Sequence, residues 1–431
     1  MKFTINSVAK SGGRIGLLSD LLRLPEASFE TPFLLLHTRG GSVPHLSYDL
    51  LQMVTNNEQH ILQMPVVSLI DCTQNVKAFG KGIAEFAGLQ EYLNYATLQD
   101  SGISTPQGYH EKNSVSIWTR HGRKLIDPQT YINCMESLKP DMFQAVADAD
   151  TSTDSTMKRV KRSVDDTIKF HSICANLKEK SEVLNQTPML ACVMGGYNVK
   201  ERLRCIEELK AFDCSGYVID GFHSNGVSAA KLNWEEVEPV LTETLSALPE
   251  QRPRVFHGAV TPLLLLKLAS RGIDIFDATF PWLVGERGGA LIFPNSLSLT
   301  AEPVTETLPI VKNVAAYAAE LKTGKQADKD QDEEETFSNC YEIDLKDKVY
   351  FNDPGPLLSN CCCYSCRKYS RSYIHHLLST TELLGPMLLM MHNLHHYLIF
   401  LRNIRSSIKE DRLDEFQDKL NNFVTSRLNK N

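Results

Sequence analysis

The sequence predicts an α/β protein: a (β/α)8 barrel, the TIM-barrel architecture, followed by a C-terminal zinc-binding subdomain and closing helices. Three observations support this prediction. Short apolar segments alternate with amphipathic segments of helical length, Asp and Gly recur where apolar segments end, and cysteines crowd together at 361–366. With 431 residues, 42% of them hydrophobic and 23% charged, the chain can bury a core of this size.

The alternating segments occupy the middle of the chain. Strands are expected at 189–196, 216–222, 254–260 and 274–280, and helices at 199–212, 233–248 and 261–272. Short apolar strands separated by single helices indicate parallel pairing through crossovers. This pattern is typical of a (β/α)8 barrel or of a doubly wound sheet.

Residues at the ends of the apolar segments favour the barrel. Strand ends are expected at Asp148, Gly195, Gly196, Asp220, Gly221, Gly258 and Asp277. In a barrel such ends form one rim, where ligands bind. No GxGxxG opens a helix after the first strand, which weakens the case for a dinucleotide-binding sheet.

Composition divides the chain into four parts. Residues 1–321 are expected to form the barrel, 322–336 a flexible charged insertion, 337–400 the zinc-binding subdomain and 401–431 the C-terminal helices. The longest apolar run, near 383–401, is interrupted by Gly385, Pro386, Asn393 and three histidines, so no transmembrane segment is expected. Eleven cysteines without a secretory signal predict reduced thiols and a cytoplasmic protein.

The cysteine cluster predicts a structural zinc site. Alternation and a tight turn direct Cys361, Cys363 and Cys366 toward one point, while Cys362 faces away. Three thiolates need a fourth ligand to complete a closed tetrahedron. The simpler interpretation, ordinary buried thiols, fits poorly with four cysteines in six residues.

Five histidines are available as the fourth zinc ligand: His375, His376, His392, His395 and His396. His392 is favoured, because it lies far enough along the chain for a later helix to fold back over the cysteines. His375 and His376 follow the cysteines too closely to reach them without straining a helix. With four protein ligands no open position remains, so the ion would be structural.

A formal charge of −7 argues against a protein whose whole surface binds nucleic acid. Local basic faces remain candidates, either Lys158, Arg159, Lys161 and Arg162 or Arg367, Lys368 and Arg371. A solvated helix face is the simpler interpretation of either run taken alone.

At this point several motifs resemble one family. The segments CCYSCRKYSRSYIHHLL and ELLGPMLLMMHNLHHY resemble the zinc region of the tRNA-guanine transglycosylases, which has CxCxxC, a YSRAYLHHL-like helix and an HNL histidine. FETPFLLLHTRGGSVPHL and SRGIDIFDATFP resemble two further motifs of that family, so the resemblance extends over nearly the whole chain. It implies a TIM barrel with zinc bound by Cys361, Cys363, Cys366 and His392.

The family resemblance also implies a reaction. Its enzymes exchange guanine for queuine or a precursor at the anticodon wobble position of tRNAs with GUN anticodons. One aspartate attacks the ribose C1′ and a second acts as acid and base, as in a retaining glycosidase. By resemblance, Asp277 in FDATFP takes the position of the nucleophile and Asp100 in LQDSG that of the acid and base. Asp148 would read the base, and Gly221 matches a glycine of the rim.

Departures from the family pattern predict a pocket that no longer selects guanine. Gly195 in VMGGY stands where a glutamine reads the base, and Asp220 replaces a glycine. In PWLVGERGG, Trp282, Leu283 and Glu286 replace threonine and two tRNA-binding arginines. Such losses would cost substrate binding roughly several kcal/mol. The two aspartates are therefore expected to be relics.

With these departures, the chain resembles the second, non-catalytic subunit of the eukaryotic enzymes of this family. The resemblance implies a heterodimer with the catalytic subunit of the enzyme, with tRNA bound through the complex and a homodimer as the alternative assembly. It also implies peripheral attachment to the mitochondrial outer membrane. A working transglycosylase that uses Asp277 as nucleophile is the alternative function, and a zinc-containing interaction module unrelated to tRNA is a third.

Overall fold

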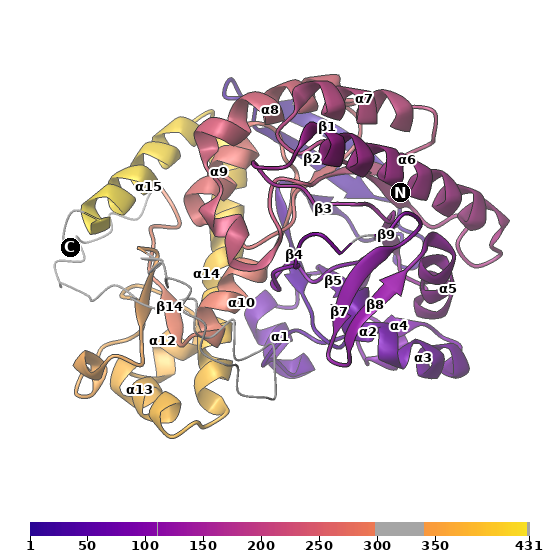
Figure 1. Ribbon diagram of the computed structural model, residues 1–431. Helices are drawn as coiled ribbons and strands as arrows, with labels where there is room; N and C mark the ends of the chain where they lie inside the picture. The colour runs from indigo at the N-terminus through magenta and orange to yellow at the C-terminus, as the bar shows by residue number, and fades with distance from the viewer. Residues whose placement is uncertain (110, 298–339, 429–431) are drawn as a thin grey trace. The chain divides into compact units, whose positions relative to one another are not determined.

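The computed structural model describes residues 1–109, 111–297 and 340–428 (Figure 1). Its contacts divide the chain into two compact units. Unit 1 comprises 1–44, 58–280 and 408–413, and unit 2 comprises 45–57, 281–407 and 414–431. The predicted charged insertion at 322–336 lies outside the described residues, and the predicted domain limits stay a prediction.

Unit 1 contains a closed barrel of parallel strands, which confirms the predicted fold class. The order around the barrel is β4–β5–β6–β9–β10–β11–β12–β13, and Ile275 of β13 pairs with Phe33 of β4 to close it. The barrel strands are β4 (Phe33–His37), β5 (Ile61–Pro65), β6 (Leu93–Thr97), β9 (Met142–Gln144), β10 (Met189–Val193), β11 (Gly216–Ile219), β12 (Arg254–Val255) and β13 (Ile275–Asp277).

Helices and smaller strands complete unit 1. The helices are α2 (Val66–Leu69), η1 (Ile70–Cys72), α3 (Thr73–Phe79), α4 (Ile83–Phe86), α5 (Pro128–Leu138), α6 (Met157–Lys180), α7 (Val199–Leu209), η2 (Gly226–Lys231), α8 (Trp234–Ala247) and α9 (Pro262–Ser270). The strands β1 (Lys2–Val8), β2 (Arg14–Ser19) and β3 (Phe29–Glu30) form an antiparallel sheet, and β7 (Val115–Thr119) and β8 (Gly122–Ile126) form a hairpin.

Side-chain caps explain where the helices of the barrel begin. Asn198, Asn233 and Thr261 each accept a hydrogen bond from a backbone N–H in the first turn of α7, α8 and α9. All three predicted helices therefore start within one residue of the expected position. The strands end earlier than predicted. Phe256 and Val260 lie beyond the barrel ladder but are still buried, so the apolar pattern continues past the end of the strand.

Unit 2 contains the remaining secondary structure. Its elements include α1 (Tyr48–Thr55), β14 (Gly289–Leu291), β15 (Glu342–Asp344), η3 (Lys348–Tyr350), α12 (Tyr364–Lys368) and α13 (Arg371–Ser379). The helices α10 (Thr279–Glu286), α14 (Leu384–Lys409) and α15 (Leu413–Leu428) lie largely in this unit. Within it, Arg287 donates two hydrogen bonds of 2.7 Å to the buried Glu342.

Candidate functional site

The aspartate at the expected nucleophile position, Asp277, ends strand β13 and is 3% exposed. Its Oδ2 accepts a 2.9 Å hydrogen bond from Gly258 N–H, and its Oδ1 accepts a 3.1 Å bond from Thr279 N–H. The Nδ1 atom of His257 lies 3.3 Å from Oδ2. Both carboxylate oxygens therefore already have donors within the protein.

The environment of Asp277 favours its charged form. Burial acts to raise its pKa, but hydrogen bonding and charge from His257 outweigh it, with help from Thr279 and Gly258. The result is a pKa below the ordinary value of 3.8. The carboxylate is thus an anion at neutral pH that the protein itself stabilises.

His257 connects Asp277 to a network of buried side chains that sequence reasoning missed. Its ring stacks on Tyr95 with centroids 5.6 Å apart, and its Nε2 lies 3.2 Å from the Tyr95 hydroxyl. Gln63 Nε2 lies 3.4 Å from His257 Nδ1. The sequence could have indicated His257 as a rim residue, because it directly precedes Gly258, which was predicted to lie at the rim.

Asp100, expected as acid and base, is also held by neighbouring side chains. It is 3% exposed, with His37 Nε2 3.5 Å from Oδ1 and Arg39 Nε 3.3 Å from Oδ2. The next residue, Ser101, shares a 2.7 Å hydrogen bond with Thr279, which itself donates to Asp277. Both predicted aspartates therefore belong to one hydrogen-bonded rim.

The expected base-reading aspartate, Asp148, pairs with a cation of its own chain. Its Oδ1 is in direct contact with Arg159 Nη2 of α6 and accepts a 3.2 Å hydrogen bond from Asp150 N–H. Asp148 is 1% exposed, so this ion pair is shielded on the carboxylate side. Arg159, one of the residues of the candidate basic faces, is therefore paired with Asp148 at the rim.

Gly195 has no room for the glutamine that the family pattern places there. Its φ of +136° is unfavourable for other residues, and an added Cβ would lie 2.6 Å from Arg202 N. The side chain of Arg202 is fully buried and donates to the carbonyls of Gly196, Val193 and Asp220 at 2.6, 3.3 and 2.8 Å. Arg202 thus ties the ends of β10 and β11 together.

Burial lowers the pKa of Arg202 to about 10, so the guanidinium is still charged at neutral pH. It also lies 3.7 Å from the ring centroid of Phe222, which supplies a cation–π contact. Asp220, the other departure at this rim, accepts a 2.6 Å hydrogen bond from Gly221 N–H. The two loops are therefore held by internal contacts.

A cavity of about 30 Å³ lies beside this rim, lined by residues that include Gln99, Asp150 and His223. One water occupies at least 10–15 Å³ of such volume, so the cavity has room for about two waters. It is too small for a purine base.

In the segment 281–289, the two positions at which the family pattern expects arginines are Leu283 and Glu286. Trp282 is 1% exposed, and its Nε1 donates a 3.0 Å hydrogen bond to Glu286 Oε1. The same oxygen contacts His45 Nε2. Glu286 therefore supports the packing of Trp282 and His45.

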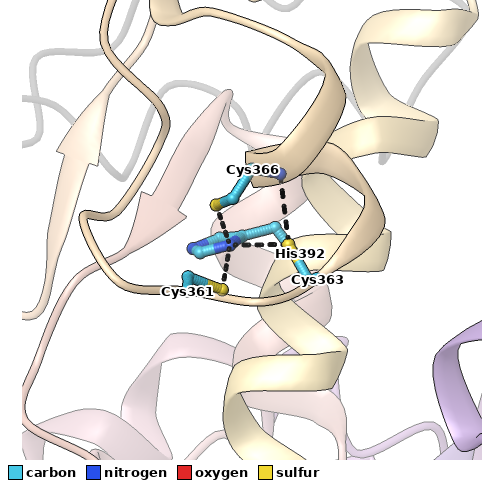
Figure 2. Close-up of side chains that lie close together, drawn as sticks. All are labelled: Cys361, Cys363, Cys366 and His392. Atoms are coloured by element: carbon cyan, nitrogen blue, oxygen red, sulfur yellow. Dashed lines mark hydrogen bonds between the residues drawn. The ribbon is translucent and has the colours of Figure 1, made fainter.

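The predicted zinc ligands lie together in unit 2 (Figure 2). Their ligand atoms all lie within 4.8 Å of one another, and His392 Nδ1 lies 3.7, 3.5 and 3.3 Å from the sulfurs of Cys361, Cys363 and Cys366. A tetrahedral zinc ion with S at about 2.3 Å and N at about 2.0 Å separates these atoms by about 3.5 Å. The four residues thus fit a metal such as zinc.

The second nitrogen of His392 fixes the ring for metal binding. Nε2 lies 2.8 Å from Leu291 O of β14 and donates to it, which leaves the Nδ1 lone pair facing the sulfurs. The neighbouring Asn393 accepts from Leu291 N–H at 2.9 Å and donates to Gly289 O at 3.0 Å. These contacts anchor α14 to β14 and place His392 over the cysteines.

The other candidate histidines serve different partners. His375 Nδ1 lies 2.8 Å from Leu345 O, and His396 Nε2 lies 2.9 Å from Phe293 O. His395 Nε2 lies 3.5 Å from Cys362, the cysteine expected to face away. Among the described residues, only the set with His392 forms a group suited to a metal ion.

Comparison with known proteins places this site in a family. Residues 10–425 match the family described as queuine tRNA-ribosyltransferase. The chain belongs to the queuine tRNA-ribosyltransferase family. The resemblance to tRNA-guanine transglycosylases in the sequence is thereby confirmed.

Individual members of the queuine tRNA-ribosyltransferase family are similar over nearly their full length. A protein of Aedes aegypti named queuine tRNA-ribosyltransferase accessory subunit 2 is 35% identical over 422 residues, which cover 97% of this chain and 92% of that protein. Proteins of the same name from Ixodes scapularis and Drosophila melanogaster are 36% and 33% identical, covering 91% and 98% of this chain and 93% and 92% of theirs.

Proposed function

We propose that this chain is the non-catalytic accessory subunit of a heterodimeric queuine tRNA-ribosyltransferase. It would support the exchange of guanine for queuine at the wobble position of tRNAs with GUN anticodons. The observation that carries the proposal is Asp277, a buried carboxylate with hydrogen-bond donors on both oxygens. The name accessory subunit 2 of its relatives supports the same assignment.

The chemistry of base exchange explains why Asp277 matters. A carboxylate that attacks the ribose C1′ needs an oxygen exposed to the substrate. Here Oδ2 faces Gly258 N–H and His257, and Oδ1 faces Thr279 N–H. Attack would require breaking these contacts.

Base selection is the second function that this rim would lack. Asp148 would have to break its ion pair with Arg159 before it could bond to a base. Gly195 has no side-chain amide. A flipped-out nucleobase is read by hydrogen bonds to its polar edge, and neither position provides one. We therefore assign base selection to the catalytic partner.

An exchange assay with labelled guanine in tRNA tests the proposed function. The purified chain alone is expected to show no exchange, and addition of the catalytic subunit is expected to restore it. Robust exchange by the chain alone would overturn the proposal in favour of a working transglycosylase. The assay should include Asp277→Asn, which distinguishes activity of this chain from contamination by the catalytic subunit.

The metal site is proposed to hold one structural Zn²⁺. Three thiolates and one imidazole fill all four positions of a tetrahedral ion, so no position is left for a substrate or a water. The ion would join the loop of Cys361 and Cys363 to α12 and α14, and so organise unit 2.

The surface proposed for the catalytic subunit lies next to this metal site. Tyr364 of α12, Tyr369 between the two helices and Tyr373 of α13 form a tyrosine ladder, with ring centroids 6.0 and 5.6 Å apart. Tyr373 is 42% exposed, and aromatic side chains are enriched at protein interfaces. We propose that the ladder contacts the catalytic subunit, or a second copy of this chain when that subunit is absent.

The cellular location is part of the same proposal. Within the described ranges, no helix has the length and apolar character that crossing a bilayer requires. All eleven cysteines lie in these ranges and none is in a disulfide bond, which suits the reducing cytoplasm. Peripheral attachment to the mitochondrial outer membrane, suggested by the family alone, is tested by fractionating cells with and without a high-salt wash.

A further inference from the structure

The hairpin β7–β8 is a feature of the barrel that the proposed function does not use. It lies in the loop between β6 and α5, which also carries Asp100, at the C-terminal end of a barrel strand (Figure 1). In (β/α)8 barrels this end carries the ligand-binding loops. The hairpin is therefore placed where a bound macromolecule would reach the rim.

The two faces of the hairpin differ in chemistry. Ile117 and Lys124 are paired across the strands. Ile117 is fully buried and Lys124 donates a 2.7 Å hydrogen bond to Asp71. This face is the inner one. Trp118 and Arg123 are the next pair and, because side chains alternate along a strand, they share the outer face.

The outer face carries a cluster of two aromatic rings and a guanidinium. The Tyr109 and Trp118 rings meet edge to face with centroids 5.7 Å apart, and Arg123 lies 5.3 Å from the Tyr109 ring centroid. Tyr109 is 49% exposed and the Arg123 side chain 38% exposed. We call Tyr109, Trp118, Arg120 and Arg123 the hairpin cluster.

Positive charge is concentrated around the hairpin cluster. Residues 109–126 have a formal charge of +3, from four Lys or Arg residues and Glu111, whereas the whole chain has −7. Arg120 in the turn has a side chain that is 77% exposed and lies 3.5 Å from Asp71. Glu111 is 3.4 Å from Arg123 and is the acidic residue at this outer face. With Lys124 on the inner face, Lys112, Arg120 and Arg123 against Glu111 and Asp71 leave this surface a formal charge of +1.

We propose that the hairpin cluster binds an unpaired nucleotide of the tRNA and its flanking phosphates. The exposed ring of Tyr109, with the half-buried Trp118 at its edge, provides a stacking surface for any base, and arginines provide the phosphate contacts. A partner protein would be matched by a more apolar surface with fewer cations. The inference rests on the proposed function, because it assigns to the accessory subunit a direct share in holding the tRNA.

The central experiment measures tRNA binding by the assembled heterodimer, using fluorescence anisotropy of labelled tRNA. Trp118→Ala is expected to weaken binding roughly 5- to 100-fold, the effect of losing one base stack. The double variant Arg120→Gln, Arg123→Gln should lower the slope of log affinity against log salt by about 1.4, because each lost contact with single-stranded RNA contributes about 0.7.

Arg252→Gln is the matched control. The Arg252 side chain is 40% exposed and 2.9 Å from Asp213, so its exposure and acidic partner resemble those of Arg123. It precedes β12 and therefore lies at the opposite end of the barrel. Unchanged affinity is expected for this variant. A loss in Arg252→Gln as large as the loss per arginine in the double variant would indicate general charge attraction and overturn the inference.

Arg123→Lys separates charge from side-chain shape. Lysine keeps the charge that a phosphate contact needs but lacks the planar group that lies over Tyr109. The salt slope is therefore expected to stay near that of the unchanged protein, and a fall of about 0.7 in the slope would contradict a phosphate contact at this position.

Trp118 also provides a direct signal. In a Trp234→Phe background the remaining tryptophans are Trp118 and the buried Trp282, so quenching of fluorescence by added tRNA would report stacking at the hairpin. Absence of quenching with tRNA bound would overturn the inference.

The two proposals fail in different ways. If heterodimers with hairpin variants bind tRNA as the unchanged protein does, the hairpin inference is wrong and the accessory function stands. If the chain alone exchanges guanine, the accessory function is wrong, whatever the hairpin binds.

Discussion

At the scale of single residues, the carboxylates at the barrel rim that the family resemblance assigns to the substrate are bonded instead to groups of the same chain. Asp277 is bonded to Gly258 and Thr279, and Asp148 to Arg159. Each contact satisfies a buried carboxylate, which would otherwise be costly. The same residues that suggest catalysis in the sequence thereby stabilise the fold.

Asp277→Asn tests this role. Because an amide cannot accept hydrogen bonds at both ends, the free energy of unfolding is expected to fall by about 1–3 kcal/mol at pH 7. Exchange by the heterodimer should stay unchanged. The two are measured by chemical denaturation and by the guanine exchange assay, and a collapse of heterodimer activity in a folded variant would point to catalysis by Asp277.

The pH dependence of stability provides a second test of Asp277. Its pKa in the folded chain is below 3.8, so its stabilising contribution is complete above that pH and disappears as the pH falls through the folded pKa. The difference in stability between the original protein and Asp277→Asn should therefore shrink in acid. A difference that does not shrink on acidification, while the chain remains folded, would contradict the assignment.

Gly195→Gln is expected to destabilise unit 1 by about 2–5 kcal/mol, because backbone strain and a clash with Arg202 add together. Gly88→Gln is the matched control. Gly88 also has a positive φ, of +70°, but no atom lies within 4 Å of an added Cβ. Denaturant unfolding of both variants separates strain from the clash, and equal losses would contradict the role of Arg202.

At the scale of elements, the zinc cluster links segments that are distant in sequence. Cys363→Ser is expected to lower metal content below about one ion per chain and to reduce thermal stability at the same time. Cys362→Ser is the control, since Cys362 is exposed and lies outside the cluster. Metal analysis and thermal unfolding test the pair, and an unchanged metal ratio in Cys363→Ser would count against the ligand set.

Elements also show how far the sequence alone leads. Apolar periodicity located β10, β11 and the helices α7–α9, because each has a regular apolar pattern and the helices also begin at a capping residue. The metal cluster could be predicted because its cysteines are close in sequence. The pairing of Asp277 with His257 and the burial of Arg202 could not, because these contacts depend on how separate loops meet at the rim.

At the scale of the whole molecule, the two proposed binding surfaces lie in different units. The hairpin cluster belongs to unit 1, and the tyrosine ladder belongs to unit 2. Association with the catalytic subunit and contact with tRNA should therefore respond to different substitutions.

Tyr373→Ala is expected to weaken heterodimer formation by about 10-fold or more, as for an aromatic residue at the centre of an interface. Leu383→Ala is the control, because Leu383 is 78% exposed and lies outside the ladder. Analytical ultracentrifugation with the catalytic subunit measures both variants. Equal association by the two would move the interface away from the ladder.

The position of Arg202 beneath Gly195 has an evolutionary consequence. A side chain at 195 would meet the backbone of Arg202, its N at 2.6 Å and its Cα at 3.0 Å, so the start of α7 would have to move before an amide fitted there. Loss of the Arg202 side chain alone would remove a donor from the carbonyls of Gly196, Val193 and Asp220 without relieving that backbone clash. A substitution at either position alone therefore lowers the stability of the fold, which disfavours the appearance of a base-reading side chain at 195.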